Sequence, residues 1–149
     1  MTVSSRKIAT VARTVQGAAF LTFGLNGFFH FLPMPPPAPA AGAFFGALFA
    51  TGYMLPLLKG TEVVTAIMLL SNRFVPLALA LIAPVIVNIL AFHAFLAPAG
   101  LALPLVLLAT ELVLAWSYRS AFAPMLRARV TADAASDSQR APLGAHATV

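Results

Sequence analysis

The stretch FVPLALALIAPVIVNILAFHAFLAPAGLALPLVLLAT, residues 74–110, contains no Asp, Glu, Lys or Arg. Residues 14–58 also lack all four charged residue types. A membrane-spanning helix needs about 20 mostly apolar residues, so each stretch is long enough to contain one. Only 9% of the 149 residues are charged and 60% are hydrophobic, whereas soluble domains carry roughly 25% charged residues. These proportions exclude a soluble globule and place the chain in lipid.

Helix-breaking residues divide the apolar part of the chain into four expected spans. These spans cover residues 11–32, 53–70, 74–96 and 101–118. A helix cannot continue after the first span, because proline lacks an N–H and clashes with the preceding turn, and this segment contains Pro33, Pro35, Pro36, Pro37 and Pro39. Residues 40–51 are too few to span, and we expect a short interfacial helix there. The predicted fold class is all-α, an integral membrane four-helix bundle.

Composition separates three regions. Residues 1–10 form a basic N-terminus, residues 11–120 form the membrane domain, and residues 121–149 form a basic and polar tail. Within this tail, residues 127–149 contain no aromatic side chain. Such a segment has too little apolar surface to pack, so disorder is expected.

The basic residues are expected to lie on one side of the membrane. Before the first span or at its start, between spans two and three, and after span four, the sequence places Arg6, Lys7, Arg13, Arg73, Arg119, Arg127 and Arg129. The proline-rich connection and the turn at residues 96–100 carry no basic residue. Cytoplasmic loops are rich in Lys and Arg, so both termini are predicted to be cytoplasmic. The net charge of +5 is therefore assigned to the lipid surface, and no nucleic-acid partner is expected.

Six polar residues of the expected spans lie at similar depth in the outer half of the membrane. They come from spans one, two and three and are Asn26, His30, Lys59, Glu62, Asn88 and His93. Ionisable groups within a membrane are costly and usually functional, so we expect one polar cavity that opens outward. Glu62, His30 and His93 are the candidate catalytic residues, as proton carriers, because histidine titrates near neutral pH. Asn26, Lys59 and Asn88 are the candidate binding residues.

A purely structural use of these residues is the alternative. Lys59 and Glu62 are three residues apart and share one helix face, where they can neutralise each other. Asn26 and Asn88 can form hydrogen bonds between helices. In this interpretation the six residues hold the bundle together and carry out no chemistry.

A second charged pair is expected near the inner side. Arg13 of the first span and Glu111 of the fourth lie at comparable depth. Charges within the membrane usually pair with one another. We therefore expect Arg13 and Glu111 to form a structural pair that fastens the first span to the last.

The residue inventory limits the possible cofactors. The chain has no cysteine, which excludes disulfides, thiolate zinc sites and cysteine-ligated iron–sulfur clusters. No zinc-type histidine spacing is present, and no metal site is expected. Axial ligation of a b-type haem by His30 and His93 is a weaker alternative, because two lone histidines have no diagnostic spacing. Paired proton carriers suit a quinone or another proton-coupled redox compound better.

Several segments resemble the DoxX-like small membrane proteins of bacteria. They are GLNGFFHFLPMPP (24–36), TGYMLP (51–56), NRFVPL (72–77) and APVIVNILAFH (83–93). The resemblance covers residues 8–120 and implies a four-helix protein of the bacterial inner membrane. It also implies a membrane subunit of a redox system that handles a quinone or a small sulfur or oxidant species. The partner would then be another membrane or soluble redox subunit.

Two other functions stay open. If the polar residues are purely structural, the protein is a membrane scaffold or assembly partner without chemistry. A small-solute transporter is the third alternative, although the four expected spans show no internal repeat of the kind that carriers often use. The sequence alone does not decide whether the chain is an enzyme.

Overall fold

The computed structural model describes residues 3–129 as a set of helices. In chain order they are α1 (Val3–Phe29), α2 (Pro39–Ala50), α3 (Met54–Leu70), α4 (Val75–Phe95), the 3₁₀ turn η1 (Pro98–Gly100), α5 (Ala102–Ser117) and α6 (Arg119–Phe122). No strand occurs within residues 3–129, so the all-α fold class is confirmed for that part of the chain. The predicted disorder of the tail falls almost entirely on residues 130–149, outside the described residues.

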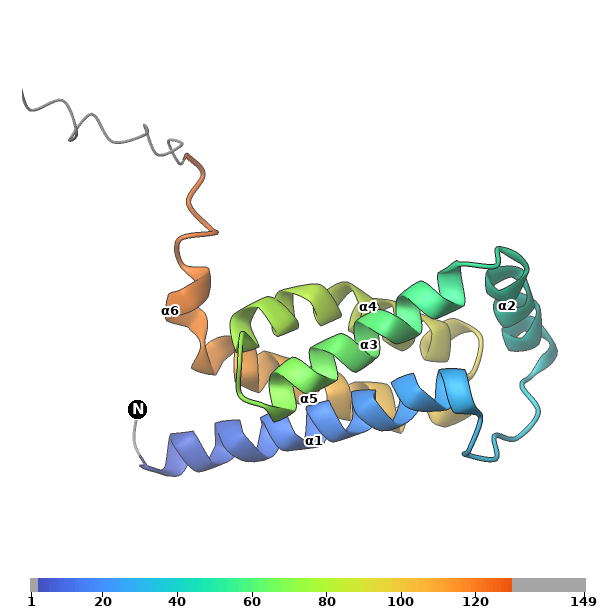
Figure 1. Cartoon of the computed structure of the whole chain (residues 1–149), viewed down its shortest axis with the longest axis horizontal. Helices are drawn as coiled ribbons and strands as arrows, with labels where there is room; N and C mark the ends of the chain where they lie inside the picture. The colour runs from blue at the N-terminus through green and yellow to red at the C-terminus, as the bar shows by residue number, and fades with distance from the viewer. Residues whose placement is uncertain (1–2, 130–149) are drawn as a thin grey trace, which may run out of the picture.

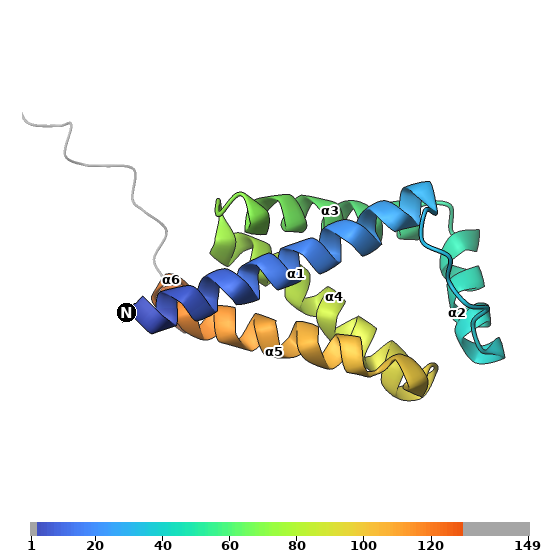
Figure 2. The same cartoon turned by 90° about the horizontal axis from the view of Figure 1, so that it is seen from below.

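Four long helices run roughly along the longest axis of the molecule (Figure 1, Figure 2). α1 contacts α3 and α5, and α4 contacts the same two helices, so the four form a closed arrangement. α2 lies across one end, bent by 94° from α3. The start of α1, the turn between α3 and α4, and α6 all lie at the opposite end (Figure 1).

Helix length and composition identify two or three candidate membrane spans. Ser5–Phe29 and Val75–Phe95 are each long and apolar enough to cross a membrane. Together, α2 and α3 pass the same test as one broken span, and Ala102–Ser117 is apolar but shorter. Many large apolar side chains are exposed on the long helices, among them Val15, Ile67, Leu77, Val87 and Leu112. This surface fits a lipid environment, since large exposed apolar patches are rare on soluble proteins.

α1 is longer at its start than the sequence predicted. It begins at Val3 rather than near residue 11, because residues 3–10 contain no Pro or Gly that would break a helix. It ends at Phe29, and His30 has a φ of 52°. The Asn26 carboxamide fixes this end, since its Oδ1 accepts a 2.6 Å hydrogen bond from the backbone N–H of Leu32.

Two glycines bring α1 close to α3. A Cβ atom on Gly17 would lie 2.8 Å from Cγ of Leu70, and one on Gly24 would lie 2.9 Å from Cγ2 of Val63. These glycines are seven residues apart and therefore share a helix face. Small residues at such positions let the backbones of membrane helices approach closely. The close approach places α3, which carries Lys59 and Glu62, against α1.

Candidate functional site

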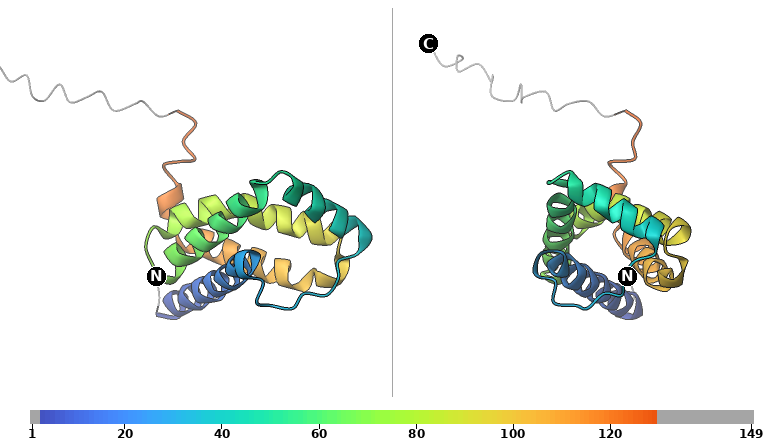
Figure 3. Two further views of the ribbon diagram at one scale, coloured as in Figure 1. Left: turned by 45° about the vertical axis from the view of Figure 1, so that its right-hand side comes forward. Right: turned by 90° about the vertical axis from the view of Figure 1, so that its right-hand side faces the viewer.

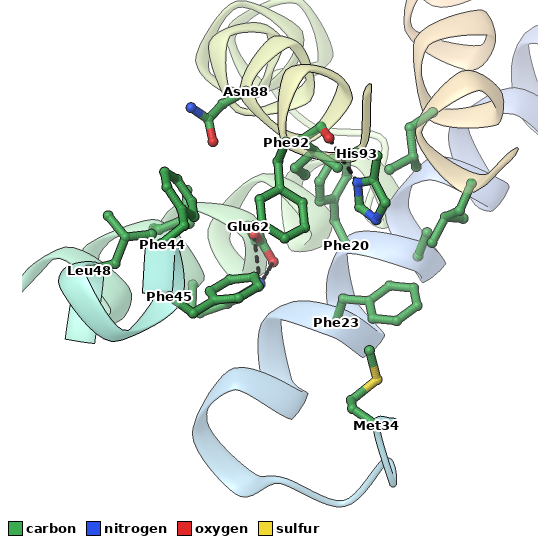
Figure 4. A pocket seen from close by; sticks show the side chains of 16 residues that line it. Phe20, Phe23, Met34, Phe44, Phe45, Leu48, Glu62, Asn88, Phe92 and His93 are labelled. Atoms are coloured by element: carbon green, nitrogen blue, oxygen red, sulfur yellow. Dashed lines mark hydrogen bonds and ion pairs between the residues drawn. The ribbon is translucent and has the colours of Figure 1, made fainter. Parts of the chain in front are cut away.

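α2 crosses one end of the bundle (Figure 3). Residues of α2 and of the neighbouring helices line a cavity with a volume of about 250 Å³. We call it the Glu62 cavity. All five helices from α1 to α5 contribute to its wall: Ala19, Phe20, Phe23, Met34, Phe44, Phe45, Leu48, Leu58, Lys59, Glu62, Asn88, Ile89, Phe92, His93, Leu103 and Leu107. Most of these side chains are apolar, and four of them are polar. Figure 4 shows Glu62 near the centre, between the phenylalanines of α1, α2 and α4.

An ion pair on α3 is the charged part of the wall. Nζ of Lys59 lies 2.9 Å from both Oε1 and Oε2 of Glu62. The Glu62 side chain is 2% exposed and that of Lys59 is 21% exposed. The three-residue spacing along one helix brings the two groups together, as the sequence predicted. Their pairing satisfies charges that lipid or an apolar wall would not solvate.

A glycine on α1 makes room for this pair. A Cβ atom on Gly27 would lie 2.4 Å from Cγ of Lys59, so the lysine stem runs directly over the glycine. A Cβ atom on Gly24, one turn earlier, would lie 3.2 Å from Cβ of Glu62. Gly24 and Gly27 of the GLNG sequence thus leave room for the side chains of Glu62 and Lys59, because they have no side chains of their own. The sequence predicted a role for the Asn and His residues of this segment but not for its glycines, although Gly17 and Gly24, seven residues apart, share one helix face.

Aromatic rings form much of the cavity wall around the ion pair (Figure 4). Phe92 of α4 packs against two rings of α2, with ring centroids 5.5 Å from Phe44 and 5.0 Å from Phe45. Phe20 and Phe23 of α1 approach from the other side (Figure 4). Aromatic pairs at such separations are mutually stabilising. The phenylalanine contacts therefore tie α2 to α4 and give the cavity walls suited to a flat ring.

His93 lies in the wall with one ring nitrogen already engaged. Its Nδ1 is 2.9 Å from the carbonyl oxygen of Ile89. A carbonyl only accepts, so Nδ1 carries a proton, and in the neutral form of the ring Nε2 is the acceptor. Gly100 gives the ring its space, because a Cβ atom there would lie 2.7 Å from Cδ2 of His93. Asn88, five residues earlier on α4, also lines the cavity but is largely exposed.

Two of the six expected cavity residues lie elsewhere. His30 is exposed beyond the end of α1, and the carboxamide of Asn26 is engaged with the backbone of Leu32. Neither residue lines the Glu62 cavity. The structure thus brings four of the six together, namely Lys59, Glu62, Asn88 and His93. Because His30 and His93 do not line one cavity, the alternative of a haem held between them loses its geometric basis.

The expected Arg13–Glu111 pair is wrong. Nη1 of Arg13 donates hydrogen bonds to the carbonyl oxygens of Leu69, at 2.5 Å, and Leu70, at 3.4 Å. These carbonyls belong to the last turn of α3, where the negative end of the helix dipole attracts a cation. The arginine therefore fastens α1 to α3 instead of α5.

Gln16 takes the place that sequence analysis gave to Arg13. Its Nε2 donates a short hydrogen bond, 2.5 Å, to Oε2 of the buried Glu111. Gln16 is fully buried, and within residues 3–129 its Oε1 has no hydrogen-bond partner. One signal for this role existed, because Gln16 is the first polar amide inside the uncharged stretch of residues 14–58.

Comparison with protein-family models, with curated proteins and with solved structures found no match to this chain. The resemblance to DoxX-like proteins therefore stays a prediction. Within the described residues, no group of three or more His, Asp or Glu side chains is arranged to hold a metal ion. The groups of the Glu62 cavity that could contact a ligand are the ion pair, His93 and the aromatic rings of the wall.

Proposed function

We propose that the chain is a four-span protein of the bacterial inner membrane, and that its Glu62 cavity binds the ring of a quinone or a similarly small oxidant. In this proposal it is a DoxX-like membrane subunit of a redox system. The observation that carries the proposal is the buried Lys59–Glu62 pair inside an aromatic-walled cavity. Such a site combines apolar surface with a few convergent polar groups, which is the usual character of a small-molecule site.

The four-span topology is supported by the direction of the helices and by the charges at their ends. α1, α3, α4 and α5 lie along one axis, with α2 across one end (Figure 1). The 16 residues of α5 extend about 24 Å at 1.5 Å per residue, short of the roughly 30 Å hydrocarbon core. Flanking residues and local thinning of the bilayer accommodate a mismatch of this size. The basic residues before α1, between α3 and α4, and after α5 favour cytoplasmic termini.

The size of the cavity supports a ring-sized ligand. Its volume of about 250 Å³ lies just below the 300–1,000 Å³ common for drug-sized ligands. A quinone ring fits such a space, while a long isoprenoid tail would have to extend outside it. Several wall residues are partly exposed, among them Met34, Phe45 and Asn88, and they provide an opening for the tail.

The polar groups match both redox states of a quinone. The Lys59 ammonium has three N–H donors, of which Glu62 accepts two, so one donor is left for a quinone carbonyl. A hydroquinone hydroxyl must instead donate, and it finds acceptors in Glu62 and in Nε2 of His93. These groups can exchange the protons that accompany two-electron reduction. The chain has no cysteine, so we assign the supply of electrons to a partner subunit.

A non-catalytic scaffold is the second candidate, and one observation favours it. Both carboxylate oxygens of Glu62 are already bound by Lys59, as expected for a pair that only neutralises itself. The two candidates differ in whether the cavity holds a ligand in the membrane.

Purification of the protein from its native membrane distinguishes them. Lipid extraction and chromatography of the wild-type protein are expected to yield close to one quinone per chain, and the Phe45→Ala variant much less. Phe49→Ala is the matched control, because Phe49 belongs to the same helix but is 74% exposed and does not line the cavity. Equal quinone contents in all three preparations would indicate that the quinone comes from bulk lipid and would favour the scaffold.

A further inference from the structure

A second cavity, of about 240 Å³, lies among segments at the end of the bundle opposite α2. We call it the Arg6–Arg13 cavity. Three parts of the chain meet there: the start of α1, the turn after α3, and the end of α5 (Figure 1). The lining residues are Arg6, Ala9, Thr10, Arg13, Asn72, Ser117 and Tyr118.

The charge of this cavity is entirely positive. Arg6 and Arg13 are seven residues apart on α1 and therefore differ by only about 20° around the helix. The described part of the chain contains two acids, and both are engaged elsewhere, Glu62 with Lys59 and Glu111 with Gln16. Within residues 3–129 neither arginine forms a salt bridge. Two cations thus face one polar cavity without a carboxylate from the described residues.

The remaining wall supplies further hydrogen-bond donors. Asn72 carries an amide NH₂ and Tyr118 a phenolic O–H. Arg13 is held in place by the carbonyl oxygens of Leu69 and Leu70, and one guanidinium has five N–H donors. Donors from three separate elements therefore surround the cavity, and they suit a ligand with several acceptor oxygens.

A neighbouring tryptophan indicates the depth of this cavity in the membrane. Trp116 immediately precedes the lining residues Ser117 and Tyr118, is 72% exposed, and has the Arg119 guanidinium 5.2 Å from its ring centroid. Exposed tryptophan is enriched at the level of the lipid headgroups. The cavity thus lies next to a residue type that marks the depth at which phosphate groups occur.

We propose that the Arg6–Arg13 cavity binds the phosphate group of an anionic phospholipid. The planar guanidinium matches phosphate oxygens with paired hydrogen bonds, and basic pockets at the cytoplasmic ends of membrane helices recognise acidic headgroups. The bound lipid bridges α1, the α3–α4 turn and the end of α5, and so stabilises this end of the bundle. The inference does not depend on what the Glu62 cavity binds.

Titration of the detergent-solubilised full-length protein with dioctanoyl phosphatidylglycerol tests this proposal. Binding is measured at fixed salt, with dioctanoyl phosphatidylcholine and inorganic phosphate as the other two ligands. Phosphatidylglycerol is expected to bind and to raise the Tm, while the other two bind much more weakly. Arg6→Gln is expected to weaken phosphatidylglycerol binding about fivefold, the effect of one basic residue on an anionic lipid.

Lys7→Gln is the matched control, because it removes the same charge one residue away and Lys7 does not line the cavity. It is expected to change the affinity less than twofold. Equal losses in the two variants would overturn the proposal, since general surface charge would then explain the binding. Equal affinity for phosphatidylcholine would also overturn it. Inorganic phosphate bound as tightly as phosphatidylglycerol would replace the lipid with free phosphate as the ligand.

Discussion

Lys59 holds both carboxylate oxygens of Glu62 at 2.9 Å, yet the two side chains differ in burial, 21% exposed for the lysine and 2% for the glutamate. The glutamate depends on its partner more than the lysine does, because the long lysine side chain can turn toward the cavity mouth. Replacing Lys59 and replacing Glu62 should therefore lower the Tm by different amounts.

Lys59→Met is expected to destabilise the protein more than Glu62→Gln. The first substitution leaves a carboxylate unpaired and buried, whereas the second leaves an ammonium that can reach water. Removing one partner of a buried pair costs about 3–5 kcal/mol, so the Tm of Lys59→Met should fall by many degrees. The double variant Lys59→Met/Glu62→Gln should recover part of the loss. A larger loss for Glu62→Gln would contradict the burial argument.

Gly24→Ala is expected to destabilise the contact between α1 and α3. The added methyl group would meet Cγ2 of Val63 at 2.9 Å and its backbone nitrogen at 3.2 Å, and overpacking of this kind typically costs about 1–3 kcal/mol. Gly46→Ala is the matched control, because nothing lies within 4 Å of that position. The control should raise the Tm slightly, since alanine favours a helix by about 0.5–1 kcal/mol over glycine. Equal Tm changes in the two variants would show that α1 and α3 are not in close contact.

Gln16→Leu is expected to cost more stability than Arg13→Gln. The leucine removes the partner of the buried Glu111 and leaves its carboxylate unsatisfied, which costs about 1–3 kcal/mol or more. Arg13→Gln loses hydrogen bonds to the end of α3, comparable with a helix-terminus interaction of about 0.3–1 kcal/mol. Adding Glu111→Leu to Gln16→Leu should restore stability, because both polar groups are then gone. Denaturation in detergent measures the stability of all three variants. A larger loss for Arg13→Gln than for Gln16→Leu would instead favour the expected pairing of Arg13 with Glu111.

Reporter fusions test the four-span topology. Fusions after Ser71 and after Met125 are expected to report the cytoplasm, and fusions within residues 33–39 and after Pro98 the outside, because the basic residues lie at the first two positions. An outside signal after Met125 would overturn the four-span arrangement and leave an odd number of spans.

The sequence predicted the helices well, because they depend on local properties. Long runs without charge contain α4 and the second half of α1. The prolines at residues 33–39 prevent the first helix from continuing in any tertiary context. The pairing of Lys59 with Glu62 was equally local, since residues three apart on one helix share a face. α2 was predicted at residues 40–51 and occupies Pro39–Ala50.

The errors concern contacts between helices and the ends of helices. His30 was predicted to line the cavity from its depth along the first span. Its actual position depends on how the chain leaves α1, with a positive φ at His30 and a hydrogen bond from Leu32 to Asn26. Equal depth also suggested the pairing of Arg13 with Glu111. The long Arg13 side chain reaches past its own level to the carbonyls of the last turn of α3. Gln16, one turn farther along α1, faces Glu111 instead. The position of a residue along a span gives its depth in the membrane. It does not give the direction in which the side chain leaves the helix, or how far that side chain reaches.

The most direct test of the proposed function is equilibrium titration of the purified full-length protein with a short-chain, water-soluble quinone. Wild-type protein and the Phe49→Ala control are expected to bind it with similar affinity. Phe45→Ala, which removes a ring from the wall, should weaken binding about tenfold, since one aromatic contact contributes roughly 0.5–1.5 kcal/mol beyond the area it buries. Binding that is absent from the wild-type protein, or equal in the Phe45→Ala and Phe49→Ala variants, would contradict a quinone site in the Glu62 cavity.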